Sequence, residues 1–454
     1  MDNIQQVAQL IERARAAQAI VAEFSQEQID AMVKAMGKII FDNAAQLAKE
    51  AVEETGLGVY EHKIMKNEKV AAFWQVLKTE KTVGIIGEDP KTGLVKIAKP
   101  LGVLGCVSPT TNPTMTPIGN GMFAVKGGNA LVVAPHPRAK KVSYNTVELM
   151  REAVVKAGGP ADIVLCIEEP SIEGTQELMK SVDVIIATGG MGMVKAAYSS
   201  GKPAFGVGQG NVQLIIDRDW DNYQLAADLS VLSRSFDNGV ICAGEQCIIM
   251  PQEKADAIKA AYVATGAYFV EDPADLVKLR EGLFPGGGPI NRDVVGQSVQ
   301  TIAGICGLSV PEGTRVIIGK AEGFGRNEML CREKLCPVMS YITYDKFEDA
   351  VNIAKTNLLY EGAGHTAVIW SNNKENAKIV GEALPVGRVV VNQPGIDAAG
   401  SLNNGLNLTP SLGCGSWGNN SISENLYIHH MINVTRVSFI DPSIVVPTPE
   451  EMWK

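Results

Sequence analysis

The stretch Val182-Asp-Val-Ile-Ile-Ala-Thr-Gly-Gly-Met-Gly-Met-Val-Lys-Ala-Ala-Tyr198 contains the repeating unit of the fold. Residues 182–187 are almost entirely apolar and rich in β-branched side chains, which predicts a strand buried on both faces. The turn Thr188-Gly-Gly-Met-Gly192 follows, and residues 193–198 enter a helix. A strand, a glycine turn and a helix in this order indicate a parallel α/β sheet.

The glycine turn is also a candidate phosphate site. A helix that starts directly after a strand presents free backbone N–H groups, and its dipole favours an anion. The turn is not a strict G-x-G-x-x-G motif, and a glycine turn after a strand is more often only a tight turn. The assignment of a phosphate site to Thr188, Gly189 and Gly190 therefore needs support from other motifs.

Further strand, turn and helix units lie on both sides of this stretch. Residues 102–217 predict a parallel, doubly wound, Rossmann-type sheet, with strands at 103–107, 130–134, 163–167 and 182–187, and helices at 142–157 and 171–179. A second α/β block predicts strands at 247–250, 315–318, 338–342, 366–370 and 388–392. Residues 1–80 have helical periodicity, residues 82–98 read as a projecting β-hairpin, and 433–440 form a last strand.

We therefore expect an α/β chain in three parts. Residues 1–231 form the first domain and carry the hairpin at about 81–100, and residues 232–425 form the second. Residues 426–454 form a C-terminal strand and tail. Exposed hairpins of this kind often meet a partner subunit, so the hairpin and last strand predict a small β oligomerisation element and a homodimer or homotetramer.

Composition excludes several classes of function. The chain has 454 residues and a net charge of -9 without a basic stripe, so neither nucleic acid nor an anionic membrane surface is expected as a partner. No apolar run reaches membrane-spanning length. The amphipathic N-terminus lacks the features of a signal peptide, which predicts a cytoplasmic protein that acts on small molecules.

The eight cysteines are scattered and predict reduced thiols. Two pairs, Cys242/Cys247 and Cys331/Cys336, share a C-x4-C spacing. Zinc pairs usually have tighter turns and nearby histidines, and none of the five histidines clusters beside these pairs, so no metal is expected.

One cysteine stands out by its context. Cys242 lies in Gly239-Val-Ile-Cys-Ala-Gly244, directly after the polar turn Phe236-Asp-Asn238. A free cysteine in a protein of this kind is usually a buried apolar residue. Flanking glycines, however, let a substrate and backbone donors approach the thiol closely.

Taken together, these segments resemble the CoA-acylating branch of the aldehyde dehydrogenase superfamily over essentially the full chain. The matching motifs occur in the family's order: Ser108-Pro-Thr-Thr-Asn-Pro113, Thr188-Gly-Gly190, Phe236-Asp-Asn-Gly-Val-Ile-Cys242, Glu333-Lys-Leu-Cys-Pro-Val338 and Leu412-Gly-Cys-Gly-Ser-Trp-Gly-Asn-Asn-Ser-Ile-Ser-Glu-Asn425. The resemblance implies a Rossmann-type cofactor domain, a catalytic domain with a nucleophilic cysteine and a β oligomerisation element.

The resemblance also implies roles for single residues. Cys242 is the nucleophile, and the Asn112 amide with the Cys242 backbone N–H stabilises the oxyanion, although Asn-Pro pairs elsewhere commonly just start turns. Glu333 lies on the nicotinamide ribose and Leu335 against the ring. The cofactor-binding set is Ser108, Thr110, His136, Pro137, Thr188, Gly189, Gly190, Glu333 and Leu335.

Two histidines leave alternatives open. His365, in Glu361-Gly-Ala-Gly-His-Thr366, is a candidate base for the coenzyme A thiol and equally a structural histidine bonded to the backbone. His136 and Arg138, in Pro135-His-Pro-Arg138, could admit a 2′-phosphate, so the cofactor is NAD with NADP possible.

One position departs from the wider family. Hydrolytic aldehyde dehydrogenases carry a glutamate that activates water, and the matching stretch Phe205-Gly-Val-Gly-Gln-Gly-Asn211 has Gly206 at that point. Without a positioned base, water attack on a thioester is slow, whereas a thiol is a better nucleophile. The sequence thus favours transfer of the acyl group to coenzyme A.

The expected reaction converts a short-chain aldehyde, CoA and NAD(P)+ reversibly to acyl-CoA and NAD(P)H. Acetaldehyde is the first choice and succinate semialdehyde the alternative, for which Lys66, Lys69 and Arg234 are candidate carboxylate partners that sequence does not place. Three rivals stay open: a hydrolytic dehydrogenase, a subunit of a filament or shell, and an acyl phosphate reductase.

Overall fold

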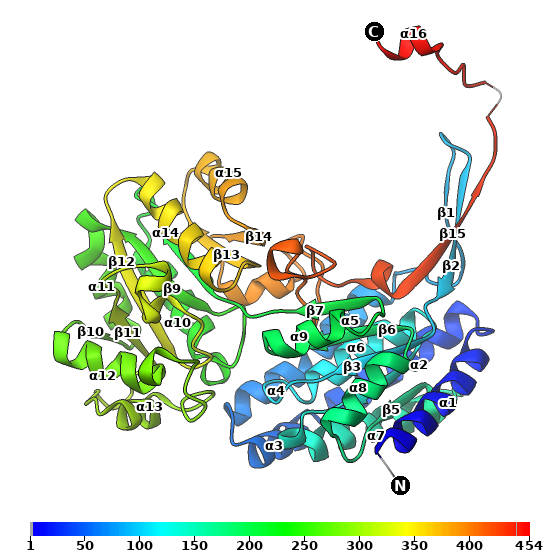
Figure 1. The fold of residues 1–454 in the computed structure, drawn as a ribbon, viewed down its shortest axis with the longest axis horizontal. Coiled ribbons are helices and arrows are strands. Elements are labelled where there is room, and N and C mark those ends of the chain that lie inside the picture. The colour runs from blue at the N-terminus through cyan, green and yellow to red at the C-terminus, as the bar shows by residue number, and fades with distance from the viewer. Residues whose placement is uncertain (1–2, 442) are drawn as a thin grey trace.

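The computed structural model describes residues 3–441 and 443–454, and two parallel sheets form the cores of two lobes (Figure 1). The first sheet has the order β5-β4-β3-β6-β7. Its strands are β3 (Val103–Val107), β4 (Ala130–Ala134), β5 (Val164–Cys166), β6 (Val184–Thr188) and β7 (Ala204–Val207). Because the chain order reverses between β3 and β6, the carboxyl ends of these strands flank a topological switch point, where doubly wound sheets bind ligands.

Helices cover this first sheet. They are α1 (Asn3–Val21), α2 (Gln26–Asp42), α6 (Met115–Lys126), α7 (Lys140–Lys156), α8 (Ile172–Ser181) and α9 (Met191–Tyr198). Helices α1 and α8 pack on each other and on β3 and β4, and α2 packs on α6 and α7. Every residue of β3 and β4 is buried, which explains why their sequences are continuously apolar.

The second sheet is also parallel and has the order β10-β11-β12-β9-β8-β13-β14. Its strands are β8 (Val212–Ile216), β9 (Glu245–Pro251), β10 (Ala267–Val270), β11 (Val316–Lys320), β12 (Val338–Tyr344), β13 (Gly364–Trp370) and β14 (Val386–Val391). Its helices are α10 (Tyr223–Ser235), α11 (Ala255–Ala264), α12 (Pro273–Leu283), α13 (Val299–Cys306), α14 (Phe347–Tyr360) and α15 (Lys374–Ala383).

Three shorter helices connect α2 to the hairpin: α3 (Ala44–Thr55), α4 (Tyr60–Glu68) and α5 (Val70–Leu77). Lys69 alone separates α4 from α5, and its backbone is itself right-handed helical. Helix α4 contacts the turn Phe236–Gly239, which immediately precedes the cysteine motif. The helical entry segment therefore reaches the second lobe.

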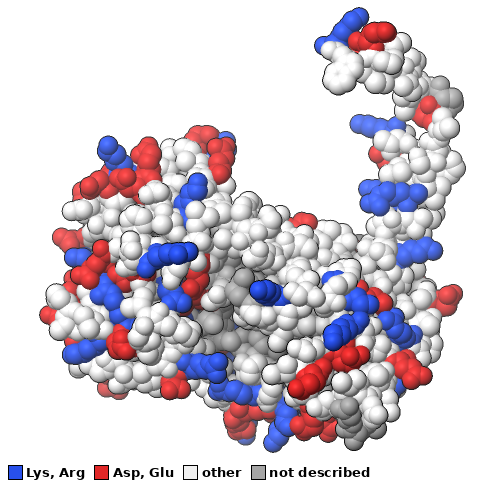
Figure 2. Space-filling view, in the orientation of Figure 1, with Lys and Arg blue, Asp and Glu red and all other residues white. Residues whose placement is uncertain are grey.

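The third sheet is antiparallel and has the order β1-β2-β15. It joins the hairpin β1 (Gly84–Asp89) and β2 (Leu94–Pro100) to the last strand, β15 (Ile432–Ser438). Figure 1 shows this sheet projecting from the lobes and continuing into the C-terminal segment with α16 (Pro449–Met452). On the face shown in Figure 2, lysine and arginine alternate with acidic residues and form no continuous stripe.

The structure confirms the predicted α/β class, the hairpin and the predicted strands, and it adds β7, β8 and β10. Strand β8 precedes the predicted domain division at 231/232 but lies in the second sheet, because it pairs with β9 and β13. The division itself stays a prediction. No helix among the described residues is long and apolar enough to cross a membrane.

Candidate active site

A cavity of about 1060 Å³ connects the two lobes. Its wall includes Ser108 and Thr188 from the switch point of the first sheet and Cys242 from the loop before β9. Ligand cavities of enzymes commonly lie at switch points and between domains, and they have about this size. The structure thus brings residues from five separate sequence motifs to one cavity.

Cys242 is the one partly exposed cysteine among the eight, and all eight are free thiols. The glycine-rich loop after β7 approaches it so closely that a Cβ at residue 210 would collide with the Cys242 carbonyl group. Burial, and then the negative charge of Glu333, raise the pKa of the Cys242 thiol to about 12. In the protein without cofactor or substrate, the thiol is accessible and protonated.

Arg234 supports the cysteine loop from behind. Its side chain is fully buried, and its guanidinium donates to the carbonyl oxygens of Gly239 and Gly244, the two ends of the cysteine hexapeptide. Burial lowers the pKa of Arg234. No short motif predicts this role, because it depends on contacts with carbonyl oxygens at both ends of the loop.

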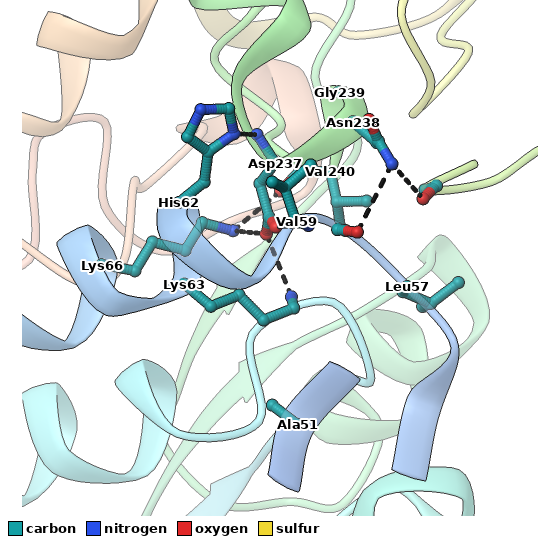
Figure 3. Close-up of polar contacts among 12 residues, drawn as sticks. Ala51, Leu57, Val59, His62, Lys63, Lys66, Asp237, Asn238, Gly239 and Val240 are labelled. Atoms are coloured by element: carbon teal, nitrogen blue, oxygen red, sulfur yellow. Dashed lines mark hydrogen bonds and ion pairs between the residues drawn. The ribbon is translucent and has the colours of Figure 1, made fainter. Parts of the chain in front are cut away.

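Asp237 ties the same loop to α4 (Figure 3). Its fully buried carboxylate accepts hydrogen bonds from the Val59 N–H at 2.8 Å, Lys63 Nζ at 3.0 Å and Lys66 Nζ at 2.6 Å. The two lysines lower the pKa of Asp237 against the opposing effect of burial. Its N–H donates to His62 Nδ1 at 2.8 Å.

The backbone at this point is strained. Asp237 and Asn238 have φ values of 53° and 52°, in the left-handed region that few residues other than glycine adopt. The Asn238 amide donates to Gly58 and Gly296, which helps to hold this conformation. We call Asp237, Lys63, Lys66 and His62 the α4 clamp, because together they fix the turn that leads to Cys242.

Asn112 also lines the cavity, two residues before the N-cap of α6. Its side chain makes no hydrogen bond within the described part of the chain, so the amide is available to a ligand. Its backbone carbonyl accepts from Thr116 N–H, which anchors the residue to the start of α6. Asn112 and Cys242 therefore line the same cavity.

All nine predicted cofactor residues line the cavity: Ser108, Thr110, His136, Pro137, Thr188, Gly189, Gly190, Glu333 and Leu335. Helix α9 begins with Gly190 as its N-cap, and no side chain caps it. A Cβ at Gly190 would meet nothing within 4 Å, so its backbone N–H groups are open to a phosphate.

Glu333 and Leu335 lie beside the thiol end of this wall. The Glu333 carboxylate accepts from Gly210 N–H at 3.1 Å, and burial and then Glu361 raise its pKa to about 8. Leu335 has a φ of 44°, a strained conformation for a leucine.

His365 lies elsewhere. It is fully buried at the start of β13, with Nδ1 at 3.0 Å from Thr366 Oγ1, and it is absent from the cavity wall among the described residues. Burial, and then Arg388, lower its pKa to about 3, so the imidazole is neutral. Its Nε2 is buried without a partner in the described chain, and a role as base for coenzyme A stays a prediction.

Gly206 lies in β7 against α9. Its N–H donates to Tyr198 Oη at 2.9 Å, and a Cβ on Gly206 would come within 2.8 Å of both the Tyr198 ring and Val194. Real Cβ atoms do not approach that closely, so the tyrosine occupies the space that a side chain at 206 would need. The described residues of the cavity wall contain a single carboxylate, that of Glu333.

One group of three possible metal ligands occurs in the described residues: Glu424, His429 and His430. The His430 Nδ1 accepts from the Tyr427 N–H at 3.0 Å, so the ring proton is on Nε2. That nitrogen lies 3.3 Å from Glu424 and donates to it. A metal would need the Nε2 lone pair, so this group is better explained as a hydrogen-bonded cluster.

The fold and the site together define an α/β protein with a doubly wound sheet, a second parallel sheet and an accessible free cysteine in the cavity that connects them. The model of the aldehyde dehydrogenase family matches residues 2–277 and 325–409. The chain belongs to the aldehyde dehydrogenase family, and it is an oxidoreductase that acts on aldehydes.

Individual relatives are similar over nearly the whole chain. A succinate-semialdehyde dehydrogenase (acetylating) from Clostridium kluyveri is 52% identical over 454 residues, which are 100% of each chain. The crystal structure of an acetylating aldehyde dehydrogenase from Geobacillus thermoglucosidasius is 36% identical with a TM-score of 0.93 over 98% of each chain. A propionaldehyde dehydrogenase from Rhodopseudomonas palustris, solved with bound CoA and an acylated cysteine, is 28% identical with a TM-score of 0.84 over 95% of this chain and 97% of that one.

Proposed function

We propose that this enzyme oxidises succinate semialdehyde with NAD(P)+ and transfers the acyl group to coenzyme A. The acylating activity agrees with the expectation from sequence and with the acetylating relatives. Acetaldehyde, the first choice from sequence, is the second candidate. The preference for succinate semialdehyde comes from the Clostridium kluyveri relative and from the lysine side chains in the cavity wall.

One observation carries the acylating reaction: Tyr198 fills the space beside Gly206. A glutamate at 206 would activate water, and the close approach of Tyr198 and Val194 leaves no room for its side chain. The acyl group on Cys242 therefore meets no base at this position. A thiol attacks a thioester with less assistance than water needs, so coenzyme A is the acceptor that this site supports.

The chemistry starts at Cys242. Its thiolate adds to the aldehyde carbon, and the Asn112 amide with the Cys242 N–H stabilises the resulting oxyanion, a contribution typically of about 3 to 4 kcal/mol. The nicotinamide cofactor, when bound, accepts the hydride. Glu333 and Leu335, which line the cavity, would orient the ribose and the ring, and Thr188-Gly-Gly190 with the start of α9 would receive a phosphate.

The second half of the reaction transfers the acyl group from Cys242 to the coenzyme A thiol. The relative with bound CoA and an acylated cysteine supports this step. We retain His365 as a candidate base for that thiol because its Nε2 has no partner among the described residues, although the residue is outside the cavity wall. His136 faces the cavity beside Arg138, which supports use of NADP as well as NAD.

The oligomeric state and location are part of the same proposal. The projecting sheet and the C-terminal segment carry exposed apolar side chains, including Phe439, Ile440 and Val445, which supports a homodimer or homotetramer. Cytoplasmic location stays a prediction, to be checked by fractionation of the producing cells.

The deciding experiment measures NADH formation from succinate semialdehyde and from acetaldehyde, each with and without coenzyme A, for the native enzyme and the Cys242→Ala variant. We expect steady turnover only with coenzyme A, faster with succinate semialdehyde, and none in the variant. Mass spectrometry should identify the acyl-CoA product.

Each rival gives a different result in this experiment. Steady release of free acid without coenzyme A would mean a hydrolytic dehydrogenase, and turnover that requires phosphate would mean an acyl phosphate reductase. A folded oligomer without turnover on either aldehyde would favour an assembly subunit. Any of these three results would overturn the proposal.

A further inference from the structure

The part of the cavity wall that α4, α5 and the residues just before Cys242 contribute is apolar apart from two lysines. Lys66 and Lys69 share this wall with Met65, Phe73, Met115, Phe236 and Ile241. Residues 65, 66, 69 and 73 have helical spacing, and the nearly continuous helices α4 and α5 place them on one face. A substrate with a terminal anion would find its cation on this face.

Lys66 already has partners. Its Nζ lies 2.6 Å from the Asp237 carboxylate and 3.1 Å from the Val240 carbonyl oxygen, and it belongs to the α4 clamp. Recruiting it to a substrate would release the turn that holds Cys242. Arg234, the third candidate from sequence, is fully buried, bonded to loop carbonyls and outside the cavity wall of the described chain.

Lys69 is different. Its side chain makes no hydrogen bond and no ion pair with any residue that the structure describes. The carboxylate that acts on it is that of half-buried Asp397, which lies in the turn between the lining residues Ile396 and Ala399 but does not approach within ion-pair distance. Lys69 is exposed as a residue, but desolvation lowers its pKa, and Asp397 opposes this only in part. A cation that lines the cavity without a partner among the described residues can pair with an anionic ligand.

We propose that Lys69 binds the carboxylate of succinate semialdehyde while the aldehyde lies at Cys242, and that Lys69 thereby selects ω-carboxylate aldehydes over neutral ones. This assignment rests on the proposed acylating function and names the residue that determines its substrate. Asp397 acts in the opposite direction, because its negative charge weakens the attraction of this end of the cavity for an anion.

The test compares succinate semialdehyde with its methyl ester, which has the same chain without the charge. For each enzyme we would measure the ratio of kcat/KM for the acid to kcat/KM for the ester, with coenzyme A and NAD+. Lys69→Met, which keeps the length of the side chain, should lower this ratio at least tenfold, mainly through KM for the acid. Lys69→Arg should keep the ratio within threefold, and Asp397→Asn should raise it.

A second readout does not depend on turnover. Succinamate resembles the substrate but carries an unreactive amide, and butyramide is its neutral counterpart. Succinamate should slow alkylation of Cys242 by iodoacetamide in the native enzyme and in Lys69→Arg but not in Lys69→Met, whereas butyramide should not distinguish them. Peptide mass spectrometry would follow Cys242 alone.

The outcomes distinguish a failure of the role of Lys69 from a failure of the proposed function. If the native enzyme gives CoA-dependent turnover and the acid-to-ester ratio is the same in Lys69→Met, the role of Lys69 is refuted while the proposed function stands. A fall in both rates together, with loss of protection by succinamate and butyramide alike, also refutes selective binding. If the native enzyme shows no CoA-dependent turnover with either compound, the proposed function itself fails.

Discussion

The Cys242 thiol is accessible, but its ionisation to the thiolate is suppressed. A nucleophilic cysteine reacts as the thiolate, yet burial and Glu333 hold the pKa of Cys242 near 12 in the ligand-free protein. The seven other cysteines are buried, so reactivity at a single site can be followed.

The influence of Glu333 on this thiol has a defined pH dependence. Because the pKa of Glu333 is raised to about 8, its charge is present mainly above pH 8. We expect Glu333→Gln to lower the pKa of Cys242 and to accelerate its alkylation by iodoacetamide roughly tenfold at pH 9.5, since one pKa unit changes the thiolate fraction about tenfold. Below pH 7 the native protein and the variant should react at similar rates.

The measurement is alkylation of the Cys242 peptide by mass spectrometry, with Cys242→Ala as the blank. Equal rates for the native protein and Glu333→Gln at pH 9.5 would show that the carboxylate does not act on the thiol.

The turn that carries Cys242 depends on helix α4 of the other lobe. Asp237 forms the centre of the clamp, and its partners Lys63 and Lys66 precede it by more than 170 residues. Burial and then the charge of Lys66 lower the pKa of Lys63 to about 8, while Asp237 opposes this. Pairs of this kind contribute little to net stability when intact but leave a costly charge when one partner is removed.

Asp237→Asn tests the clamp without adding strain, because asparagine tolerates the left-handed backbone at least as well as aspartate. We expect a loss of about 3 to 5 kcal/mol in the free energy of unfolding, measured in urea, since two lysines lose their counter-ion. The rate of CoA-dependent turnover should fall as the loop loosens. Lys66→Met, which retains the Asp237–Lys63 pair, is the matched control and should cost less. A loss below 1 kcal/mol for Asp237→Asn would contradict the clamp.

Local sequence patterns predict much of the fold. They predict few of the contacts that hold the cysteine loop in place. Strands β3 and β4 coincide with the predicted ranges because continuous apolar runs carry their own signal. Strand β10 has only four residues, and β8 contains the buried polar Gln213, so neither gave a clear pattern. The roles of Arg234 and Asp237 arise from contacts with carbonyls and with a distant helix, which no short motif records.

The sequence predicts the residues that line the cavity better than the residues that support the site from outside the cavity. Every residue predicted to bind cofactor, together with Asn112 and Cys242, lines the cavity, because the family motifs specify side chains that face ligands. His365 does not line it, and its burial could not be read from a glycine-rich loop. From the sequence, Lys66, Lys69 and Arg234 are equivalent candidates for binding a substrate carboxylate. Only their different partners in the structure distinguish them.

Among the described residues, the projecting sheet and the segment beyond it present unpaired apolar side chains. Strand β15 ends the three-stranded sheet, and the segment beyond it exposes Ile440 at 94%, Val445 at 87% and Trp453 at 92%. A strand edge next to exposed apolar side chains favours pairing with another chain. This is the surface on which we base the proposed oligomer.

Deletion of residues 439–454 should therefore reduce the molecular mass observed by light scattering after gel filtration, because the apolar contacts between subunits would be lost. Replacement of Glu450 and Glu451 by glutamine, which keeps the apolar residues, is the control and should leave the mass unchanged. An unaltered oligomer after deletion would place the interface elsewhere.

The contact between Tyr198 and Gly206 also constrains how such an enzyme can evolve or be engineered. A glutamate introduced alone at 206 meets the tyrosine ring, so the first mutational step toward hydrolysis carries a packing cost and no working base. Changes that make room at 198 and at Val194 have to come first or together with it, and a smaller residue at 198 removes the hydrogen bond to the Gly206 N–H. These positions are epistatic, and the passage between thiol transfer and hydrolysis is a route of ordered substitutions and not a single replacement.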